Sequence, residues 1–360
     1  MNKETNTYVA IMAGGAGTRF WPSSTEQSPK QFLDILGVGK SLLQLTYERF
    51  LKLCRKDHIY IVSNEKYRDL IKSQLPEISN EQIIGEPSRN NTAPCVAYIS
   101  FKIDKLNPNA NLIVAPSDHL ITNEDDFIGY LKKGLSYVSE NNSIATLGLK
   151  PHSPSTGYGY IKYGPSISTG VHQLVQFTEK PNLETAKSFI ASNQYLWNSG
   201  LFLFKVKHIL SEFQKNSVGI YDILEKGKAA YNTPNEKAFI NINYPKTPNI
   251  SIDYAIMEKT KNAVTIPADL NWSDLGTWGS LFDISKKDPQ NNVINGNVVL
   301  NDCDDNLIKI PANKIASIKG LSDYIIVLEN DVLLIHPKSD EQEIKAIRTS
   351  IQEKFGTQFT

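Results

Sequence analysis

A glycine-rich turn directly after an apolar strand is the stretch of this sequence best suited to chemistry. The turn contains Gly14, Gly15 and Gly17. Glycine carries no Cβ, so the backbone amides of such a turn can approach phosphate oxygens closely. Two cations follow, Arg19 and Lys30, and each can neutralise part of a polyphosphate. Together they predict a phosphate-binding loop.

The order of these residues excludes the two commonest phosphate loops. A Walker loop has Lys and then Ser or Thr after its last glycine, whereas Gly17 is followed by Thr18 and Arg19. A dinucleotide fingerprint that began at Gly15 would need its third glycine where Phe20 stands. P-loop hydrolases and dehydrogenases are therefore excluded, and a third kind of loop is predicted.

Two aspartates after strand-like segments could bind a metal ion. Asp118 follows the apolar run 112–115 and a Pro-Ser turn, and Asp274 lies in the turn 271–276. A lone aspartate in such a place is often only a helix N-cap. As a pair, the two could hold Mg²⁺ against a triphosphate, because Mg²⁺ prefers a few carboxylate oxygens plus phosphate and water. The sequence alone does not bring them together.

Further polar clusters could bind a sugar phosphate or a base. Glu179 and Lys180 suit either a surface ion pair or a clamp on sugar hydroxyls and phosphate. Asn198 offers an amide beside an aromatic residue, and the glycine-rich segment 156–160 can expose backbone amides. Glu86 could accept hydrogen bonds from a base edge, since guanine presents N–H donors. Asn91 or Thr92 is expected to cap the helix that follows.

The composition is that of an ordinary globular chain. Its 360 residues suit one large domain and a smaller one. Lys plus Arg and Asp plus Glu number 38 each, which argues against general affinity for nucleic acid or an anionic membrane. The three cysteines lack CxxC spacing and are expected to be reduced, buried thiols. No apolar leader or membrane-length segment occurs, so a cytoplasmic location is expected.

Alternating strand and helix patterns in the first two thirds must position these residues. Such βαβ alternation predicts an α/β fold, a mostly parallel sheet with helices on both faces. Ligands of such sheets bind beyond the carboxyl ends of the strands. A helix is expected over 41–54. The strands expected are 8–13, 59–63, 112–115, 143–149, 174–178 and 201–204.

The pattern changes near residue 286. Short β-like pieces separated by Asn, Asp and Gly follow, and a final helix is expected after Pro337. We therefore expect a catalytic domain over 1–285 and a small β-rich tail with a terminal helix over 286–360. The tail carries no catalytic constellation, so packing or self-association is its expected role.

Eight segments in this order resemble the sugar nucleotidyltransferases, and within them the mannose-1-phosphate guanylyltransferases (GDP-mannose pyrophosphorylases). The resemblance covers nearly the whole chain. PKQFL, NTAP and PSDH are typical of the guanylyl branch rather than the uridylyl, thymidylyl or adenylyl branches. The segments are AGGAGTRFWPSS at 13–24, PKQFL at 29–33, EPSRNNTAP at 86–94, APSDH at 115–119, TGYGYI at 156–161, FTEKP at 177–181, WNSGLF at 197–202 and NWSDLG at 271–276.

The resemblance implies a Rossmann-like mixed sheet and a small C-terminal region like a left-handed β-helix, which often mediates dimerisation. It also implies Mg²⁺-dependent formation of GDP-mannose and diphosphate from GTP and α-D-mannose 1-phosphate. Arg19 and Lys30 would hold the triphosphate, and Mg²⁺ would bind between Asp118 and Asp274. The nucleotide-binding set is Gly14, Gly15, Gly17, Thr18, Glu86, Asn91 and Thr92. The sugar-phosphate set is Gly157, Glu179, Asn198 and, on the phosphate, Lys180.

One departure from the family pattern leaves the roles of Arg89 and Asn90 open. The family often has EPxxRNTAP, whereas here Asn90 stands at the arginine position and Arg89 precedes it. Two other functions also stay open: a sister nucleotidyltransferase with another base or sugar, and a non-catalytic nucleotide-sensing homologue. A non-catalytic homologue could lack one of the charged residues assigned to the site, yet this sequence has all of them: Arg19, Lys30, Asp118, Lys180 and Asp274.

Overall fold

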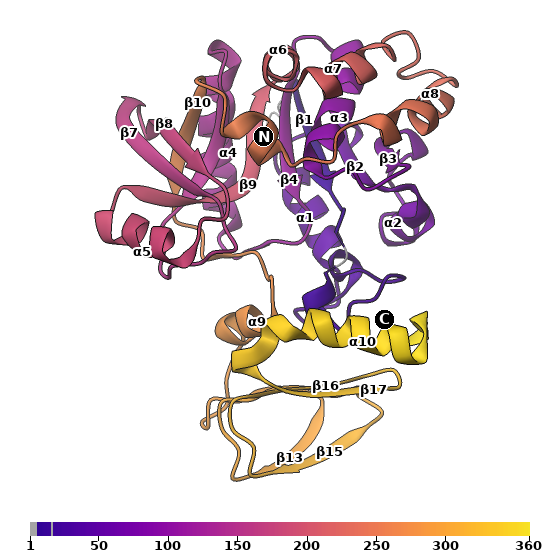
Figure 1. The fold of residues 1–360 in the computed structure, drawn as a ribbon, viewed down its shortest axis with the longest axis vertical. Helices are drawn as coiled ribbons and strands as arrows, with labels where there is room; N and C mark the ends of the chain where they lie inside the picture. The colour runs from indigo at the N-terminus through magenta and orange to yellow at the C-terminus, as the bar shows by residue number, and fades with distance from the viewer. Residues whose placement is uncertain (1–5, 16) are drawn as a thin grey trace. The chain divides into compact units, whose positions relative to one another are not determined.

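The computed structural model describes residues 6–15 and 17–360, which form two compact units (Figure 1). The larger, the sheet unit, comprises 6–14, Thr46–Ser117 and Ile121–Trp272. The smaller, the coil unit, comprises Gly15–Leu45 without residue 16, Asp118–Leu120 and Ser273–Thr360. Two short strands, β5 (Leu120–Ile121) and β11 (Trp272–Ser273), each contain a point where the chain passes between units.

A nine-stranded mixed sheet forms the centre of the sheet unit. β3, β2, β1 and β4 pair in parallel, and so do β6 and β10. β9 lies between these two groups and runs antiparallel to both β4 and β6. In sheet order the strands are β3 (Ile83–Glu86), β2 (Ile59–Asn64), β1 (Thr7–Met12), β4 (Asn111–Pro116), β9 (Tyr195–Lys205), β6 (Ile144–Leu149), β10 (Ala263–Ala268), β8 (Val171–Thr178) and β7 (Tyr160–Ser168).

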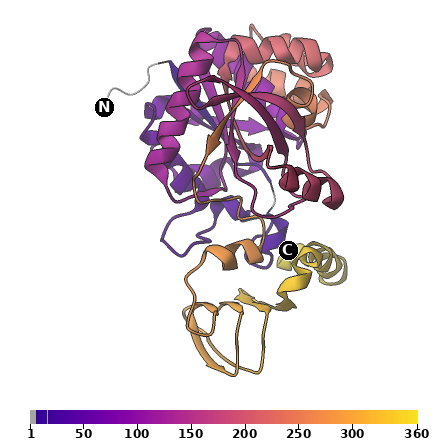
Figure 2. The same cartoon turned by 90° about the vertical axis from the view of Figure 1, so that its left-hand side faces the viewer.

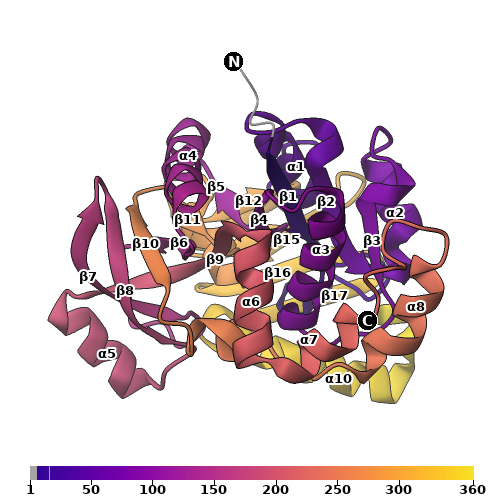
Figure 3. The same ribbon diagram turned by 90° about the horizontal axis from the view of Figure 1, so that it is seen from above.

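Helices cover both faces of this sheet (Figure 3). Apolar residues of α3, α6 and α7 share one core with Tyr60, Leu112 and Phe204 of the strands, and α4 lies on the opposite face. The central strands are almost continuously buried, as two-sided cover requires. The helices are α1 (Leu42–Leu51), α2 (Arg68–Gln74), α3 (Thr92–Leu106), α4 (Glu124–Glu140), α5 (Leu183–Ser192), α6 (Val206–Asn216), α7 (Val218–Glu225) and α8 (Glu236–Asn243).

The predicted α/β fold with a mixed, mostly parallel sheet is confirmed. All six predicted strands are present, although β9 begins at Tyr195 and β8 at Val171, earlier than predicted. Three strands of this sheet were not predicted, namely β3, β7 and β10. The antiparallel course of β9 was also not predictable from alternation, because a strand's direction depends on its connections and not on its own residues.

The coil unit contains short strands stacked in successive turns (Figure 2). Their residues Leu307 and Ile325 share an apolar core with Phe20, which follows the glycine turn. β12, β14 and β16 pair in parallel, and β13 pairs in parallel with β15. Trp278 Nε1 donates to Trp21 O at 3.1 Å within a core that includes Phe20 and Ile344. The elements are α9 (Trp278–Ile284), β12 (Val293–Asn295), β13 (Asn297–Asn301), β14 (Leu307–Lys309), β15 (Ile315–Lys319), β16 (Tyr324–Glu329), β17 (Val332–Pro337) and α10 (Ile344–Phe355).

Buried asparagines connect successive turns of the coil unit. Asn306 Nδ2 donates to Asn292 Oδ1 at 3.0 Å, and Tyr324 N donates to Asn306 Oδ1 at 2.9 Å. The β-rich tail and its terminal helix, α10, are therefore present as predicted. The domain boundary expected near 286 falls between α9 and β12 and stays a prediction.

Two expectations about the cysteines and membrane segments can be compared with the structure. Cys54, Cys95 and Cys303 are free thiols and all three are buried, as predicted. Across residues 6–15 and 17–360, no helix combines the length and apolar character needed to cross a bilayer.

A buried ion pair joins α3 to α8. Lys102 Nζ lies 2.7 Å from Glu236 Oε2, and the two residues are only 6% and 9% exposed. Tyr98 Oη and Asn232 N also donate to the Glu236 carboxylate, each at 2.6 Å. These donors offset the cost of removing the charges from water.

We expect Glu236→Ala to lower the free energy of unfolding by about 3–5 kcal/mol, because it leaves the Lys102 ammonium buried without its partner. Denaturant unfolding followed by circular dichroism measures this loss. Glu225→Ala is the matched control, since its carboxylate pairs with Lys228 at an exposed position and should change stability little. Equal losses in both variants would contradict the importance of the buried pair.

Candidate active site

The glycine turn begins where β1 ends. Ala13 N donates to Val62 O and Ser63 Oγ donates to Ala13 O, both at 2.7 Å, so β2 holds the end of β1 in place. Gly14 and Gly15 follow and are exposed, and a Cβ at either would meet no atom within 4 Å. The backbone there leaves room for a ligand, as a phosphate loop requires.

Gly17 packs against Lys30 within the coil unit. Gly17 has φ 56°, and a Cβ there would lie 2.4 Å from Lys30 Cβ, so only glycine fits. It precedes the short 3-10 helix η1 (Thr18–Phe20), which carries Arg19. Arg19 is exposed and forms no ion pair with any residue in the described part of the chain. Its guanidinium can therefore meet an anionic ligand without breaking a pair.

Lys30 connects the two aspartates that the sequence singled out. Its buried Nζ donates to Asp118 Oδ2 at 2.9 Å and to Asp274 O at 2.7 Å. The same atom lies 5.7 Å from the Phe20 ring centroid, on the positive-charge-binding face of an aromatic ring. Asp118 lies 88 positions from Lys30 in the chain and Asp274 lies 244 positions from it, yet both contact its ammonium group.

The Asp118 carboxylate is ionised but still accessible. Burial raises the pKa of this carboxyl, yet the Lys30 ammonium and His119 outweigh burial, so the pKa lies below its ordinary value. The side chain is 34% exposed, and its Oδ1 has His119 Nε2 at 4.0 Å. Asp274 Oδ1 accepts a hydrogen bond from Gly276 N at 3.0 Å, which orients that carboxylate.

The chemistry of these two aspartates fits a magnesium ion. They supply oxygen ligands only, and within residues 6–15 and 17–360 no group of three or more His, Cys, Asp or Glu could hold a metal. Mg²⁺ commonly takes one or two carboxylates and completes its shell with phosphate and water. The protein's part of such a shell would be Asp118 and Asp274, with Lys30 already on one Asp118 oxygen.

A second polar cluster lies in the sheet unit after β8. The Glu179 side chain is 6% exposed and pairs with Lys180 Nζ, whose side chain is 58% exposed. A Cβ on Gly159 would lie 2.6 Å from Glu179 Oε2, so the glycine-rich segment approaches this carboxylate closely. Gly157 is exposed, and its N–H donates to Ser155 Oγ at 3.2 Å.

Asn198, on β9, joins this cluster through Asp253, which the sequence analysis missed. Asn198 Nδ2 donates to Asp253 Oδ1 at 3.3 Å, and its Oδ1 accepts from Thr146 Oγ1 at 3.1 Å. Burial and the Glu179 carboxylate raise the pKa of Asp253 to about 6. Asp253 opens a single π-helical turn. An acidic residue at the start of a helical segment is ordinary, so no local signal marked it.

An aromatic wall accompanies the glycine-rich segment in the sheet unit. Tyr158 lies between Gly157 and Gly159 in the chain. Its ring centroid is 4.8 Å from that of Trp197 and 5.3 Å from that of Trp272. The Trp197 ring also meets His152 edge-on at 4.7 Å. The aromatic side chains and the carboxylates of the cluster suit the apolar faces and hydroxyl edges of a sugar.

Glu86 ends β3, at the carboxyl edge of the parallel strands. Tyr244 Oη donates to Glu86 Oε1. Burial raises the pKa of Glu86 to about 7, although the bond from Tyr244 opposes the rise. Its second oxygen takes no hydrogen bond from the part of the chain that the structure describes. That oxygen can still meet a polar ligand such as a base edge.

The loop after β3 contains a helix cap. Asn91 is the N-cap of α3 and its Oδ1 accepts from Thr92 N at 2.9 Å, so the capping prediction is confirmed. Thr92 Oγ1 accepts a hydrogen bond at 2.9 Å from the backbone N–H of Ile252, the residue before Asp253. Any contact of Asn91 or Thr92 with a nucleotide would come in addition to these structural roles.

The two residues at the family departure have identifiable contacts. Asn90 is buried, and its Nδ2 donates to Thr247 O at 2.8 Å, which ties the loop to the segment after α8. Arg89 is exposed and its guanidinium donates to Tyr67 Oη at 3.3 Å. Asn90 thus has a packing role in this loop.

The family follows from a comparison with known proteins. A family model described as nucleotidyl transferase matches residues 8–291, most of the chain. The chain therefore belongs to the nucleotidyl transferase family, and the predicted enzyme class is confirmed. The matched residues include the glycine turn, Lys30 with its partners Asp118 and Asp274, and the Glu179 cluster.

Individual proteins within this family are similar to the chain over most of its length. The chain is 39% identical to "Mannose-1-phosphate guanylyltransferase RfbM" of Salmonella typhimurium, over 94% of this chain and 71% of that protein. It is 34% identical to "Mannose-1-phosphate guanylyltransferase" of Escherichia coli K12, over 97% of this chain and 74% of that protein. A crystal structure named mannose-1-phosphate geranyltransferase, from Thermus thermophilus, matches with a TM-score of 0.87 and 28% identity, covering 96% and 99% of the two chains.

We expect Asp253→Asn to change how stability depends on pH. The pKa of Asp253 is about 6 in the folded chain against an ordinary value of 3.8, so its stabilising contribution is complete below about pH 4 and is lost as the pH rises through about 6. Relative to the variant, the wild type should lose on the order of 3 kcal/mol across that window.

Denaturant unfolding at several pH values measures this difference. Asp222→Asn, which changes an exposed aspartate of α7, is the matched control. If the free energies of unfolding of the wild type and of Asp253→Asn change in parallel with pH, ionisation of the Asp253 carboxyl does not destabilise the folded chain.

Proposed function

We propose that this chain catalyses the reaction of GTP with α-D-mannose 1-phosphate to give GDP-mannose and diphosphate. The observation that carries the proposal is the Lys30 ammonium held between Asp118 and Asp274, in a member of the nucleotidyl transferase family. The choice of guanylyl and mannosyl groups is supported by two relatives, 39% and 34% identical, that are named mannose-1-phosphate guanylyltransferase.

The chemical step needs alignment and charge compensation more than proton transfer. An oxygen of the sugar phosphate is already anionic near neutral pH and attacks the α-phosphorus of GTP. The new P–O bond forms as the bond from the α-phosphorus to the oxygen bridging to the β-phosphorus breaks, and diphosphate leaves with that electron pair. Repulsion between the two anionic substrates opposes the step. Fixed cations that contact the phosphates of both substrates should therefore stabilise the transition state.

Arg19 and Lys30 are the proposed cations on the triphosphate. Arg19 is exposed on a short helix after the turn, whereas Lys30 is buried and positioned by three contacts. A lysine in fixed contacts needs little reorganisation when negative charge develops beside it. Nucleotide phosphates would lie along the glycine turn, lined by Gly14, Gly15, Gly17 and Thr18, and the base near Glu86, Asn91 and Thr92.

Mg²⁺ would be held by Asp118 and Asp274. When bound, it supplies neutralisation of phosphate charge and fixes the triphosphate geometry. Asp118 fits this role because its pKa is lowered and its carboxylate is partly exposed. The Gly276 N–H holds the Asp274 carboxylate in one orientation.

The sugar phosphate would be held by the cluster after β8. Glu179 and Asn198 can bond hydroxyls, the exposed Gly157 backbone can meet the ring, and Lys180 can reach the phosphate. Release of Lys180 from Glu179 toward the phosphate would free the carboxylate for hydroxyls. The cytoplasmic location and the homodimer stay predictions; free buried thiols are usual in a reducing compartment.

A substrate panel tests the proposed reaction. Diphosphate release is measured with GTP, UTP, dTTP and ATP, each with mannose 1-phosphate and with glucose 1-phosphate. GTP with mannose 1-phosphate should give the highest kcat/KM. Preference for another pair would identify a sister nucleotidyltransferase, and no turnover with any pair would favour the nucleotide-sensing homologue.

We expect Asp118→Asn and Asp274→Asn each to lower kcat by roughly 10²-fold or more, by analogy with the loss of other charged groups that stabilise transition states. Mn²⁺ binding in the presence of GTP, followed by electron paramagnetic resonance, should weaken in parallel. Asp269→Asn, an exposed aspartate close in sequence to Asp274, is the control. Unchanged Mn²⁺ binding in either test variant would remove that residue from the metal site.

We expect Lys180→Ala to raise the KM for mannose 1-phosphate far more than the Kd for GTP, because its exposed ammonium is assigned to the sugar's phosphate. Steady-state kinetics and GTP titration measure the two quantities. Lys187→Ala on α5 is the matched control for loss of a nearby lysine. Equal effects on both substrates would argue against the assignment.

A further inference from the structure

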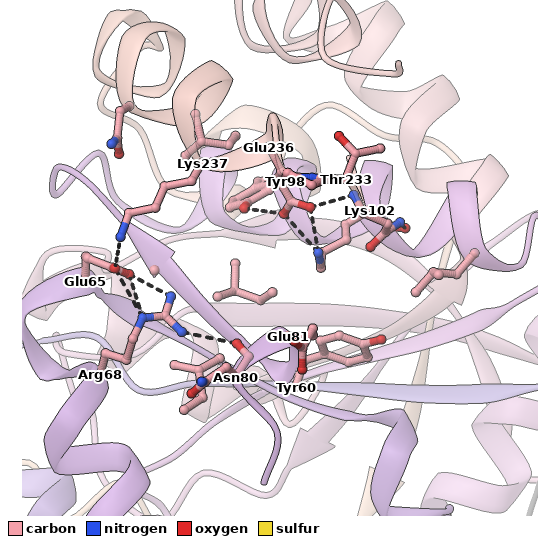
Figure 4. Close-up of a pocket in the computed structure, with 18 residues that line it drawn as sticks. Tyr60, Glu65, Arg68, Asn80, Glu81, Tyr98, Lys102, Thr233, Glu236 and Lys237 are labelled. Atoms are coloured by element: carbon pink, nitrogen blue, oxygen red, sulfur yellow. Dashed lines mark hydrogen bonds and ion pairs between the residues drawn. The ribbon is translucent and has the colours of Figure 1, made fainter. Parts of the chain in front are cut away.

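A polar pocket, which we call the β3-edge pocket, lies in the sheet unit (Figure 4). Its volume is about 600 Å³, within the roughly 300–1,000 Å³ of typical small-molecule sites. Its walls come from β2, β3, α3, α8 and the segments beside β3. None of its lining residues belongs to the nucleotide-binding or sugar-phosphate sets named above.

The inner wall of the pocket carries the buried ion pair between α3 and α8. Lys102 and Glu236 both line the cavity, and Tyr98 Oη donates to Glu236 beside them (Figure 4). The outer wall carries a second set of charges. Glu65 accepts from Arg68 Nη2 at 2.7 Å and lies 3.0 Å from Lys237 Nζ. Charged side chains therefore frame the pocket on two sides.

The charges of the pocket are balanced, which disfavours an anionic ligand. Every lining cation is paired with a carboxylate, as the contacts of Arg68, Lys102 and Lys237 show. A phosphate or carboxylate ligand would have to break one of these pairs and leave a desolvated glutamate behind. Glu81, by contrast, forms no ion pair with a residue that the structure describes. The wall therefore offers no spare positive charge.

The pocket nevertheless offers open hydrogen-bonding groups of both kinds. The Tyr60 hydroxyl and the Asn80 and Asn241 side-chain amides make no hydrogen bond with another described residue. Hydroxyls and amides can each donate and accept. Apolar surface alternates with these groups and comes from Ile83, Leu106, Pro234 and Ile240.

We propose that the β3-edge pocket binds a neutral, hydroxyl-rich ligand of the size of a mono- or disaccharide. Sugar hydroxyls can both donate to and accept from the open tyrosine and asparagine groups, and the C–H faces of the ring suit the apolar wall. The site is separate from the residues assigned to the sugar phosphate, so it would bind whether or not the proposed reaction is correct.

The test is titration of the full chain with two neutral sugars, methyl α-D-mannopyranoside and maltose, and with inorganic phosphate as the charged contrast. Isothermal titration measures affinity, and NMR of isotope-labelled tyrosine locates binding. We expect at least one sugar to bind and to shift the Tyr60 and Tyr98 signals. Phosphate should leave those signals unchanged.

Four variants distinguish this pocket from the sugar-phosphate cluster. Tyr60→Phe should weaken sugar binding about three- to tenfold through the loss of one hydrogen bond, whereas Tyr137→Phe on α4 should not. Asn241→Trp places a bulky side chain from an exposed position into the pocket and should abolish binding. Asn198→Ala should leave the Tyr60 and Tyr98 shifts intact.

Three results would overturn the proposal. The first is a wild-type chain that binds neither sugar at millimolar concentration. The second is sugar affinity and tyrosine shifts that survive Asn241→Trp. The third is loss of those shifts in Asn198→Ala, which would place the sugar in the other cluster.

Discussion

The coil unit's polar centre depends on one buried ammonium group. The buried Lys30 Nζ donates to a carboxylate oxygen of Asp118 and to the backbone carbonyl of Asp274. Burying that charge is tolerable only because an ionised partner and a carbonyl dipole surround it. Gly17 is part of the same arrangement, because any side chain there would collide with Lys30. The glycine turn and the cation are thus one packed structure.

The sheet unit uses charge differently in its two polar regions. In the cluster after β8, the carboxylates of Glu179 and Asp253 lie near each other, and burial together with the Glu179 charge raises the pKa of Asp253 to about 6. Such a cluster favours the arrival of a cation or of donor-rich hydroxyls. In the β3-edge pocket every cation is already paired, so the same residue types favour a neutral ligand. The two regions differ in the neighbouring carboxylates of the first, Glu179 and Asp253, because the cation there, Lys180, is paired as well.

Much of the fold was predictable because its signals are local. Buried strands read as apolar runs, and the glycine turn, the tail and the terminal helix follow from short segments. β3 and β7 were missed, since β3 is only four residues long and β7 is largely exposed along its second half. Asp253 was missed for another reason: its neighbours in the chain do not distinguish it, and only the approach of Glu179 and Asn198 does.

The amino-acid sequence by itself determined the family, the prediction of a phosphate loop and the residue types available for each proposed role, because motif order and side-chain chemistry are properties of the chain. Only the tertiary structure decided which of these residues meet. It joined Asp118 and Asp274 through Lys30, gave Asn90 a packing role and assembled the pocket beside β3. Such contacts link positions far apart in the chain, and no local pattern of residues encodes a distance between them.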